Sequence, residues 1–239
     1  MVMTATNLTE EEKLIVGQIR RFVEREVMPV ASELEHGNEY PQALIDQMRQ
    51  MGLFACVIPS EYGGLGLNFT TYAAIVEELS RGWMSLGGIL NTHAIVSYML
   101  TAYGTEEQRQ RFLPAMATGE VRCGLTITEP DAGSDVQAIQ TTVRHDGDGY
   151  LLNGTKMFVS NGRHGRLFAV LCKTDARAQP PHRGMSVLLM EKEGTPGLTV
   201  GREIEKLGYK GIDTTEFVFQ DTRVPERNLL GGVEGQGFA

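Results

Sequence analysis

The sequence is poor in the residues that form disulfides and metal sites. Its 239 residues include three cysteines and five histidines. Cys56, Cys123 and Cys172 lie far apart among apolar neighbours, which is typical of reduced thiols in a core rather than of disulfides or metal ligands. The histidines are scattered, without the spacing of ligands. We therefore expect no metal site, and the reduced thiols favour a cytoplasmic location.

The chain also lacks a long apolar run and an excess of positive charge. It has no stretch of about 18 apolar residues, so no membrane span is predicted. The start, MVMTATNLTEEEK, does not show the charged region and apolar stretch of a signal peptide. The formal net charge is -8. A nucleic-acid partner is not expected, because such proteins present a basic face to the phosphates.

Residues 1–120 show the hydrophobic period of helices. Apolar residues recur every three or four positions from Ile15 to Leu34, and Gly37 follows as a predicted helix end. The same period returns in later segments, with another end predicted at Gly52. The expected helix starts are marked by capping or first-turn residues at Thr9, Pro41, Asn68, Ser85 and Thr105.

After Gly119 the pattern changes to short runs of β-forming residues that are broken by glycine. Asp146–Gly149 and Asn153-Gly154 predict hairpin turns. The expected strands are Thr141–Arg144, Tyr150–Leu152, Thr155–Val159, Leu167–Lys173, Met185–Glu191, Leu198–Val200 and Thr215–Phe219. The predicted fold class is α+β, with an N-terminal α-helical domain followed by an antiparallel β-barrel or sandwich-like domain.

We predict a helical domain at residues 1–120, a β domain at 121–230 and a linker at 231–239. The last segment is rich in glycine and has no helix or strand pattern of its own. It resembles a connection to a further part of the protein.

One glycine-rich segment imitates a phosphate-binding loop. Gly63–Gly66 reads GGLG, but the Lys-Ser/Thr of a P-loop does not follow it, and it does not join a strand to a helix. We predict that these glycines shape a loop between two helices.

Residues 125–136, LTITEPDAGSDV, form the first candidate site. Thr126 and Thr128 alternate with apolar residues, so both hydroxyls are expected on one face of a strand. Ser134 follows in a bend whose backbone N–H groups suit an anion or the edge of a polar heterocycle. Ordinary turn chemistry also explains the proline, the glycine and the acidic residues. Both interpretations stay open on the pattern alone.

Residues 156–162, KMFVSNG, repeat this theme at a strand end. Phe158 supplies an aromatic ring and Ser160 a hydroxyl, with Val159 between them. A planar conjugated cofactor needs an aromatic neighbour and a few hydroxyl and amide donors along its polar edge. The two stretches together suggest a cofactor site.

Five segments of the chain, in family order, resemble the acyl-CoA dehydrogenases, which are FAD-dependent flavoproteins. They are Ile58–Gly66, YGTEEQRQRFLPAMATGE, LTITEPDAGSDV, LNGTKMFVSNG and EKLGYKGIDTTEFVFQDTRVPERNLLG. The family has an N-terminal helical domain, a middle β domain and a C-terminal four-helix bundle. The first two correspond to the predicted domains, and the bundle is missing. The family's catalytic base, a Glu, would lie in that bundle, as would most of the contacts with acyl-CoA.

The resemblance gives roles to the first candidate stretch. Thr128, with backbone donors from Leu125 and Ile127, would meet the pyrimidine edge of the flavin. Such donors stabilise the negative charge that collects there when the flavin is reduced. Ser134 would contact the pyrophosphate or the CoA part of the substrate.

The resemblance also gives roles to the second stretch. Phe158 stands where the family usually has a Trp beside the flavin ring, and Val159 follows it. Ser160 replaces the usual Thr and keeps a hydroxyl for flavin N5. Ile212 stands where a Ser is common, which departs from the family pattern.

Substrate contacts are implied on a helix and in a loop. Four residues align with one wall of the acyl pocket, namely Gly88, Asn91, Thr92 and Ile95. His182 and Arg183 lie in a loop where a CoA contact is implied, although the pattern itself favours a solvent-exposed basic pair.

The implied activity is FAD-dependent α,β-dehydrogenation of an acyl-CoA thioester in fatty acid metabolism. We expect it of the full-length parent, with this chain an inactive fragment. The alternatives are an acyl-CoA oxidase, a flavin monooxygenase of the same fold, or a non-catalytic binding module. The implied partners are an acyl-CoA, an electron-transfer flavoprotein or similar acceptor, and further copies of the chain in a dimer or tetramer.

Overall fold

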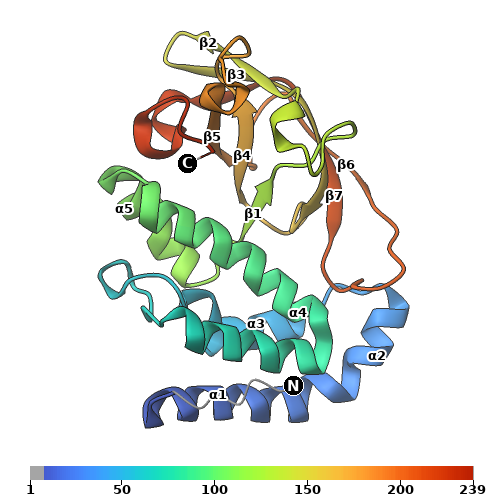
Figure 1. Ribbon diagram of the computed structural model, residues 1–239. Helices are drawn as coiled ribbons and strands as arrows, with labels where there is room; N and C mark the ends of the chain where they lie inside the picture. Colours follow the sequence, from blue (N-terminus) through green and yellow to red (C-terminus); the bar gives the residue numbers. More distant parts are fainter. Residues whose placement is uncertain (1–7, 239) are drawn as a thin grey trace.

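Within residues 8–238, which the computed structural model describes, helices come first along the chain and strands second (Figure 1). The helical part packs below a curled sheet in the view of Figure 1, and the link between β6 and β7 reaches down to α2. Residues 1–7 and 239, which belong to the predicted domains, lie outside the described residues. The predicted fold class, a helical part followed by a β part, is confirmed.

The helices begin close to the predicted caps. The side chains of Thr9 and Thr105 each accept the backbone N–H of the residue three positions later. The side chain of that later residue accepts the backbone N–H of the threonine, so both capping boxes are present. The helices are α1 (Glu10–Phe22), α2 (Met28–Gly37), α3 (Gln42–Gln50), α4 (Phe69–Tyr103) and α5 (Glu106–Ala117).

The first predicted helix is interrupted. A π-helical turn, Val23–Val27, separates α1 from α2, just before Pro29. Proline has no N–H to donate to the preceding turn, which explains a local change of hydrogen-bond pattern there. The predicted helix end at Gly37 is confirmed, and the left-handed cap that follows it is Asn38, with φ 56°.

The third and fourth predicted helices form one element, α4, with a break at Trp83. Trp83 has the extended angles φ -159° and ψ 112°. Its indole Nε1 donates to Glu35 of α2 at 2.9 Å, and the same carboxylate oxygen accepts the N–H of Lys210 at 2.9 Å. Burial raises the pKa of Glu35, but these hydrogen bonds outweigh it and hold the pKa below its ordinary value. Glu35 thus joins α2, α4 and the β6–β7 link.

The loop between α3 and α4 confirms the structural interpretation of its glycines. Gly63 has φ 83° and Gly66 has φ 58°, both in the left-handed region. Gly64 passes so close to the backbone that a Cβ atom there would lie 1.8 Å from the carbonyl oxygen of Ile58. Gly64 donates its N–H to Pro59 at 3.0 Å, which fixes the tight turn.

Over residues 8–238, seven strands form one mixed sheet in the order β1-β4-β2-β3-β7-β6, with β5 paired to β4. Most neighbours are antiparallel, as predicted, but β1 and β2 both pair with β4 in parallel. The strands are β1 (Cys123–Thr126), β2 (Thr142–Asp146), β3 (Gly149–Ser160), β4 (Leu167–Lys173), β5 (Met185–Glu191), β6 (Leu198–Glu203) and β7 (Thr214–Pro225).

One predicted hairpin is present and the other is wrong. The chain turns between Asp146 and Gly149, as predicted. At Asn153-Gly154 the strand continues, and β3 only shifts its register against β7. A Cβ atom on Gly154 would lie 2.4 Å from the Thr141 hydroxyl, so this glycine permits a close approach rather than a turn.

The core that joins the two parts lies between α4, α5 and the sheet. Val96 and Leu113 from the helices pack in one cluster with Leu167 and Leu189 from β4 and β5. All three cysteines are buried and free, and burial raises the pKa of Cys56 to about 12. Such thiols are inert, in agreement with a core role.

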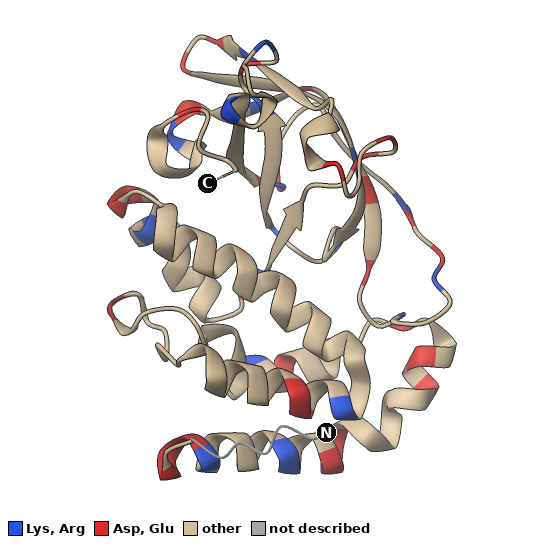
Figure 2. Ribbon diagram, viewed as in Figure 1, with Lys and Arg blue, Asp and Glu red and all other residues tan. Residues whose placement is uncertain are grey.

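The surface mixes both signs of charge. In Figure 2, α1 begins with acidic residues and carries basic residues farther along, and both signs of charge lie around the sheet. Among the described residues, no helix is both long and apolar enough to span a bilayer. Over the same residues, no group of three or more His, Cys, Asp or Glu side chains is arranged to hold a metal ion.

Candidate functional site

The first candidate stretch leaves β1 and enters a loop. The strand ends at Thr126, whose buried hydroxyl donates to the carbonyl of Ala169 at 3.4 Å. Thr128 lies beyond the end of β1, so the expectation that both threonine hydroxyls project from one face of a strand is wrong. Ile127 and Thr128 are half-buried in the loop and Leu125 is half-buried in β1, while Ser134 is exposed.

The second candidate stretch contains a β-bulge. The register of β3 against β7 gains one residue between Lys156 and Val159. Phe158 lies in this bulge with φ 57°, a left-handed conformation that costs a bulky residue about 1–2 kcal/mol. Its ring is 58% exposed. Bulges and strained aromatic residues of this kind are typical of functional sites, where they re-aim a side chain.

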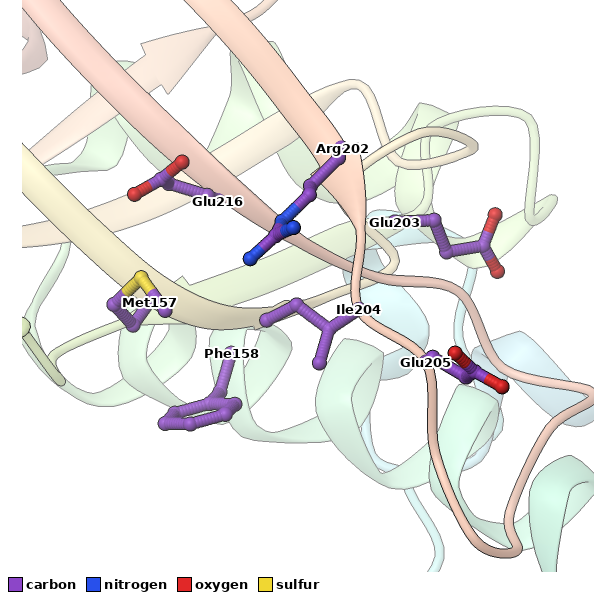
Figure 3. Close-up of a pocket in the computed structure, with 7 residues that line it drawn as sticks. All are labelled: Met157, Phe158, Arg202, Glu203, Ile204, Glu205 and Glu216. Carbon is purple, nitrogen blue, oxygen red and sulfur yellow. The ribbon is translucent and has the colours of Figure 1, made fainter.

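Phe158 lines a pocket of about 450 Å³. In Figure 3 its ring lies below Met157, Ile204 faces both, and the guanidinium of Arg202 reaches toward them from the end of β6. The carboxylates of Glu203 and Glu205 point away from the ring in this view. The sequence did not predict that Arg202–Glu205 line this pocket, because nothing in it places the end of β6 beside the bulge of β3.

The two candidate stretches are joined directly. Met157 donates its N–H to the carbonyl of Thr128 at 2.8 Å. The ammonium of Lys156 lies 2.8 Å from the carbonyl oxygen of Ile127 and 2.9 Å from Oε1 of Glu129. Sequence analysis predicted a shared site but not this buried ion pair. The available signal was a lysine inside an otherwise β-forming run.

The other two predicted cofactor residues of β3, Val159 and Ser160, differ in burial. Val159 is buried, and its side chain packs in the core of the sheet. Ser160 is half-buried at the end of β3. The next residue, Asn161, is buried and donates to the carbonyls of Ile89 on α4 and Cys123 on β1, at 3.3 and 3.0 Å. Asn161 therefore fixes the end of β3 against both elements.

The predicted substrate residues fall into two separate places. Asn91, Thr92 and Ile95 lie on α4 and are exposed or half-exposed. Gly88 is buried, and a Cβ atom there would lie 1.4 Å from the Tyr209 hydroxyl. Its small size therefore admits Tyr209 from the β6–β7 link.

His182 and Arg183 lie away from the Phe158 pocket. They belong to a short 3₁₀ turn, Pro181–Gly184, before β5. The ring of His182 is 5.8 Å from that of Phe238, and a Cβ atom on Gly235 would lie 2.4 Å from the Arg183 carbonyl. Neither residue lines the pocket that holds Phe158.

The strain at Phe158 can be measured by substitution. We expect Phe158→Gly to be more stable to denaturant than Phe158→Ala by about 1 kcal/mol, because only glycine adopts this backbone conformation without cost. Urea unfolding of the two variants measures the difference. A more stable alanine variant would contradict the left-handed bulge.

The structure thus combines a helical part with a curled mixed sheet, and a strained aromatic residue of β3 lines a pocket. Two family models match the chain, "Acyl-CoA dehydrogenase, N-terminal domain" over residues 9–120 and "Acyl-CoA dehydrogenase, middle domain" over residues 124–222. The chain belongs to the acyl-CoA dehydrogenase family.

Individual relatives agree with this assignment. The chain is 37% identical over 233 residues to a short-chain specific acyl-CoA dehydrogenase of Clostridium acetobutylicum, covering 97% of the chain and 60% of that protein. It is 43% identical to the acyl-CoA dehydrogenase structure from Geobacillus kaustophilus, with a TM-score of 0.92, covering 98% of the chain and 61% of that one.

A structure that contains FAD is also similar. The acyl-CoA dehydrogenase from Bacillus anthracis, complexed with FAD, is 32% identical with a TM-score of 0.88, covering 99% of the chain and 39% of that one. The chain thus spans 60% of the length of the Clostridium relative and 61% of the Geobacillus structure.

Proposed function

We propose that this chain supplies the FAD-binding part of an enzyme that dehydrogenates acyl-CoA thioesters at the α and β carbons. The observation that carries the proposal is the Phe158 bulge, held against the Thr128 loop beside a pocket of about 450 Å³. A pocket of this size, with an aromatic ring and a few polar groups, suits a planar cofactor. Of the residues with an implied flavin contact, Phe158 alone lines this pocket, so the proposed fit to the flavin ring rests on that aromatic ring and on the Thr128 loop bonded to Met157 beside it.

Each residue would act through its own group. The hydroxyl of Thr128 and backbone donors at Leu125 and Ile127 would bind the polar edge of the ring. Phe158 would cover the ring and exclude water from it. The hydroxyl of Ser160, and backbone groups of Val159 beside it, would orient the ring from the end of β3. When bound, FAD supplies the acceptor for the hydride of the substrate.

Ser134 and the α4 residues would bind the parts of the ligands that lie farther out. Ser134 is exposed at the loop bend, where it would contact the pyrophosphate or the CoA. Gly88, Asn91, Thr92 and Ile95 would form one wall for the acyl group. We keep His182 and Arg183 as a proposed CoA contact outside the Phe158 pocket.

No carboxylate of residues 1–239 is proposed as the catalytic base. The base would be a Glu in a C-terminal helical bundle that follows the proposed domains at 1–120 and 121–230 and the linker at 231–239. The length of the relatives supports this proposal, since the chain covers 60% of the Clostridium protein. We also propose a cytoplasmic location, an electron-transfer flavoprotein as acceptor, and a dimer or tetramer.

The surface of α4 supports self-association or contact with such a bundle. Met84, Ile95 and Tyr98 are exposed on this helix, and the ring of Phe69 lies 5.3 Å from that of Tyr98 in an edge-to-face contact. Exposed apolar groups of this kind are typical of interaction surfaces.

The test uses the purified polypeptide of residues 1–239 with added FAD, butyryl-CoA and a dye acceptor. We expect weak flavin uptake, visible in the flavin absorbance bands, and no turnover, because the proposed base would lie outside residues 1–239. Turnover would contradict the proposed position of the base. Failure to take up any FAD would favour a non-catalytic binding module. Rapid reoxidation of the reduced flavin by oxygen would favour an oxidase or a monooxygenase.

A further inference from the structure

We propose that Lys156 and Glu129 are positioning residues that hold the Thr128 loop against the Phe158 bulge and thereby set the affinity of the site for FAD. The part about FAD rests on the proposed function. The part about position rests on the contacts of the two side chains alone.

The pair is almost completely buried. The side chain of Lys156 is 0% exposed and that of Glu129 is 5% exposed, with 2.9 Å between Nζ and Oε1. Burying two charges is costly, and an apolar pair of similar size often gives equal stability. A stabilising role alone therefore does not explain why charged groups occupy this place.

Each charge satisfies backbone groups that an apolar side chain would leave without partners. Besides Glu129, Lys156 Nζ donates to the carbonyl of Ile127 at 2.8 Å. The carboxylate of Glu129 accepts the N–H of Gln140 at 2.5 Å and the N–H of Thr141 at 3.0 Å. These bonds close the loop that begins after Glu129 and returns to β2. The pair thus fixes both ends of the loop that carries Ser134.

Glu129 and Lys156 are next to the candidate site residues along the chain, so the ion pair can position them. Ile127 and Glu129 flank Thr128, and both contact the Lys156 ammonium. Lys156 is followed by Met157, whose N–H bonds the Thr128 carbonyl at 2.8 Å. Phe158 comes next, in the left-handed bulge. Thr128 is therefore held from both sides by the segment that also aims the Phe158 ring.

The electrostatics agree with an intact ion pair. Burial raises the pKa of Glu129, but hydrogen bonds at Thr141 and Gln140 and the charge of Lys156 outweigh it, so the pKa lies below its ordinary value. Burial lowers the pKa of Lys156, and Glu129 opposes this shift.

The test compares the wild-type chain with Glu129→Gln and Lys156→Met. Glutamine keeps the shape of the side chain but offers one oxygen instead of two to the N–H groups of Gln140 and Thr141. We expect both variants to bind FAD at least tenfold more weakly in titration, with shifted absorption bands of the bound flavin. We also expect at least tenfold faster amide hydrogen exchange at Met157.

The matched control is Glu78→Gln. Glu78 is also a buried carboxylate, 9% exposed, and it pairs with Arg20 at 2.5 Å and Arg81 at 3.0 Å in the helical part. We expect this variant to lose stability but to keep the wild-type FAD affinity and flavin spectrum.

The outcomes separate the two proposals. Folded Glu129→Gln and Lys156→Met chains with wild-type affinity, spectrum and exchange at Met157 would overturn the positioning role. A wild-type chain that takes up no FAD would overturn the proposed function, together with the part of this inference about affinity. Exchange at Met157 would still decide whether the pair holds the loop to the bulge.

Discussion

Lys156→Met is expected to lower the free energy of unfolding by about 3–5 kcal/mol at neutral pH. The substitution leaves the carboxylate of Glu129 buried with its two backbone donors but without an opposite charge. It also leaves the carbonyl of Ile127 without the ammonium that it accepts from. Denaturant unfolding of the variant and the wild type at pH 7 measures the difference.

Lowering the pH is expected to reduce the difference in free energy of unfolding between the wild type and Lys156→Met. In the wild type the pKa of Glu129 lies below the ordinary value of 4.5, so its contribution to stability is complete above that pH and is lost as the pH falls through the lower folded value. Without Lys156 we expect burial to raise the pKa of the Glu129 carboxyl. Protonation at low pH then removes the cost of the unpaired buried charge in the variant. Unfolding series between pH 7 and pH 4 show the effect. A difference that grows on acidification would contradict the ion pair.

The control for this prediction is an exposed lysine in an ion pair. Lys13 pairs with Glu10 at 2.7 Å, but the two side chains are 51% and 88% exposed. Lys13→Met is expected to change the stability by less than about 0.5 kcal/mol. A loss as large as that of Lys156→Met would show that removal of any lysine, rather than of the buried one, is responsible.

Gly64→Ala is expected to lower the free energy of unfolding by about 3 kcal/mol, or to prevent folding. The added Cβ atom would lie 1.8 Å from the carbonyl oxygen of Ile58, and this contact is with backbone that has no rotamer to change. The carbonyl of Ile58 also accepts the N–H of Gly66 at 2.8 Å, so moving it breaks the loop. Thermal and denaturant unfolding measure the loss.

Gly133→Ala, in the loop between β1 and β2, is the matched control for Gly64→Ala. No atom lies within 4 Å of the position of a Cβ on Gly133, and the residue is exposed. The free energy of unfolding of the Gly133→Ala variant is expected to stay within about 0.5 kcal/mol of the wild-type value. Equal losses at Gly64 and Gly133 would argue against the close approach at Ile58.

Local signals in the sequence were sufficient for most of the helices and strands. The capping boxes at Thr9 and Thr105 depend on residues three positions apart, so the sequence displays them completely. The break in α4 at Trp83 and the parallel pairing of β1 with β4 depend on distant partners, which no local pattern contains. The same reason explains the wrong turn prediction at Asn153-Gly154, since the close neighbour of Gly154 is Thr141, just before β2.

The candidate site divides in the same way. The pattern of residue types identified the stretches that contain Thr128 and Phe158, and the bond from Met157 to Thr128 places them together. The partners that hold them, Glu129 and Lys156, are far apart in the sequence and each resembles an ordinary charged residue until the fold buries both. The left-handed conformation of Phe158 is imposed by the register of β3 against β7, against the preference of the residue itself.

The indole of Trp83 has a consequence for following the two parts of the molecule in solution. It is the only tryptophan in the sequence, it is buried, and it is bonded to Glu35 where α2, α4 and the β6–β7 link meet. All tryptophan fluorescence therefore comes from this junction. Its emission reports, without any label, whether the helical part and the sheet stay together while a ligand binds at the other end of that link.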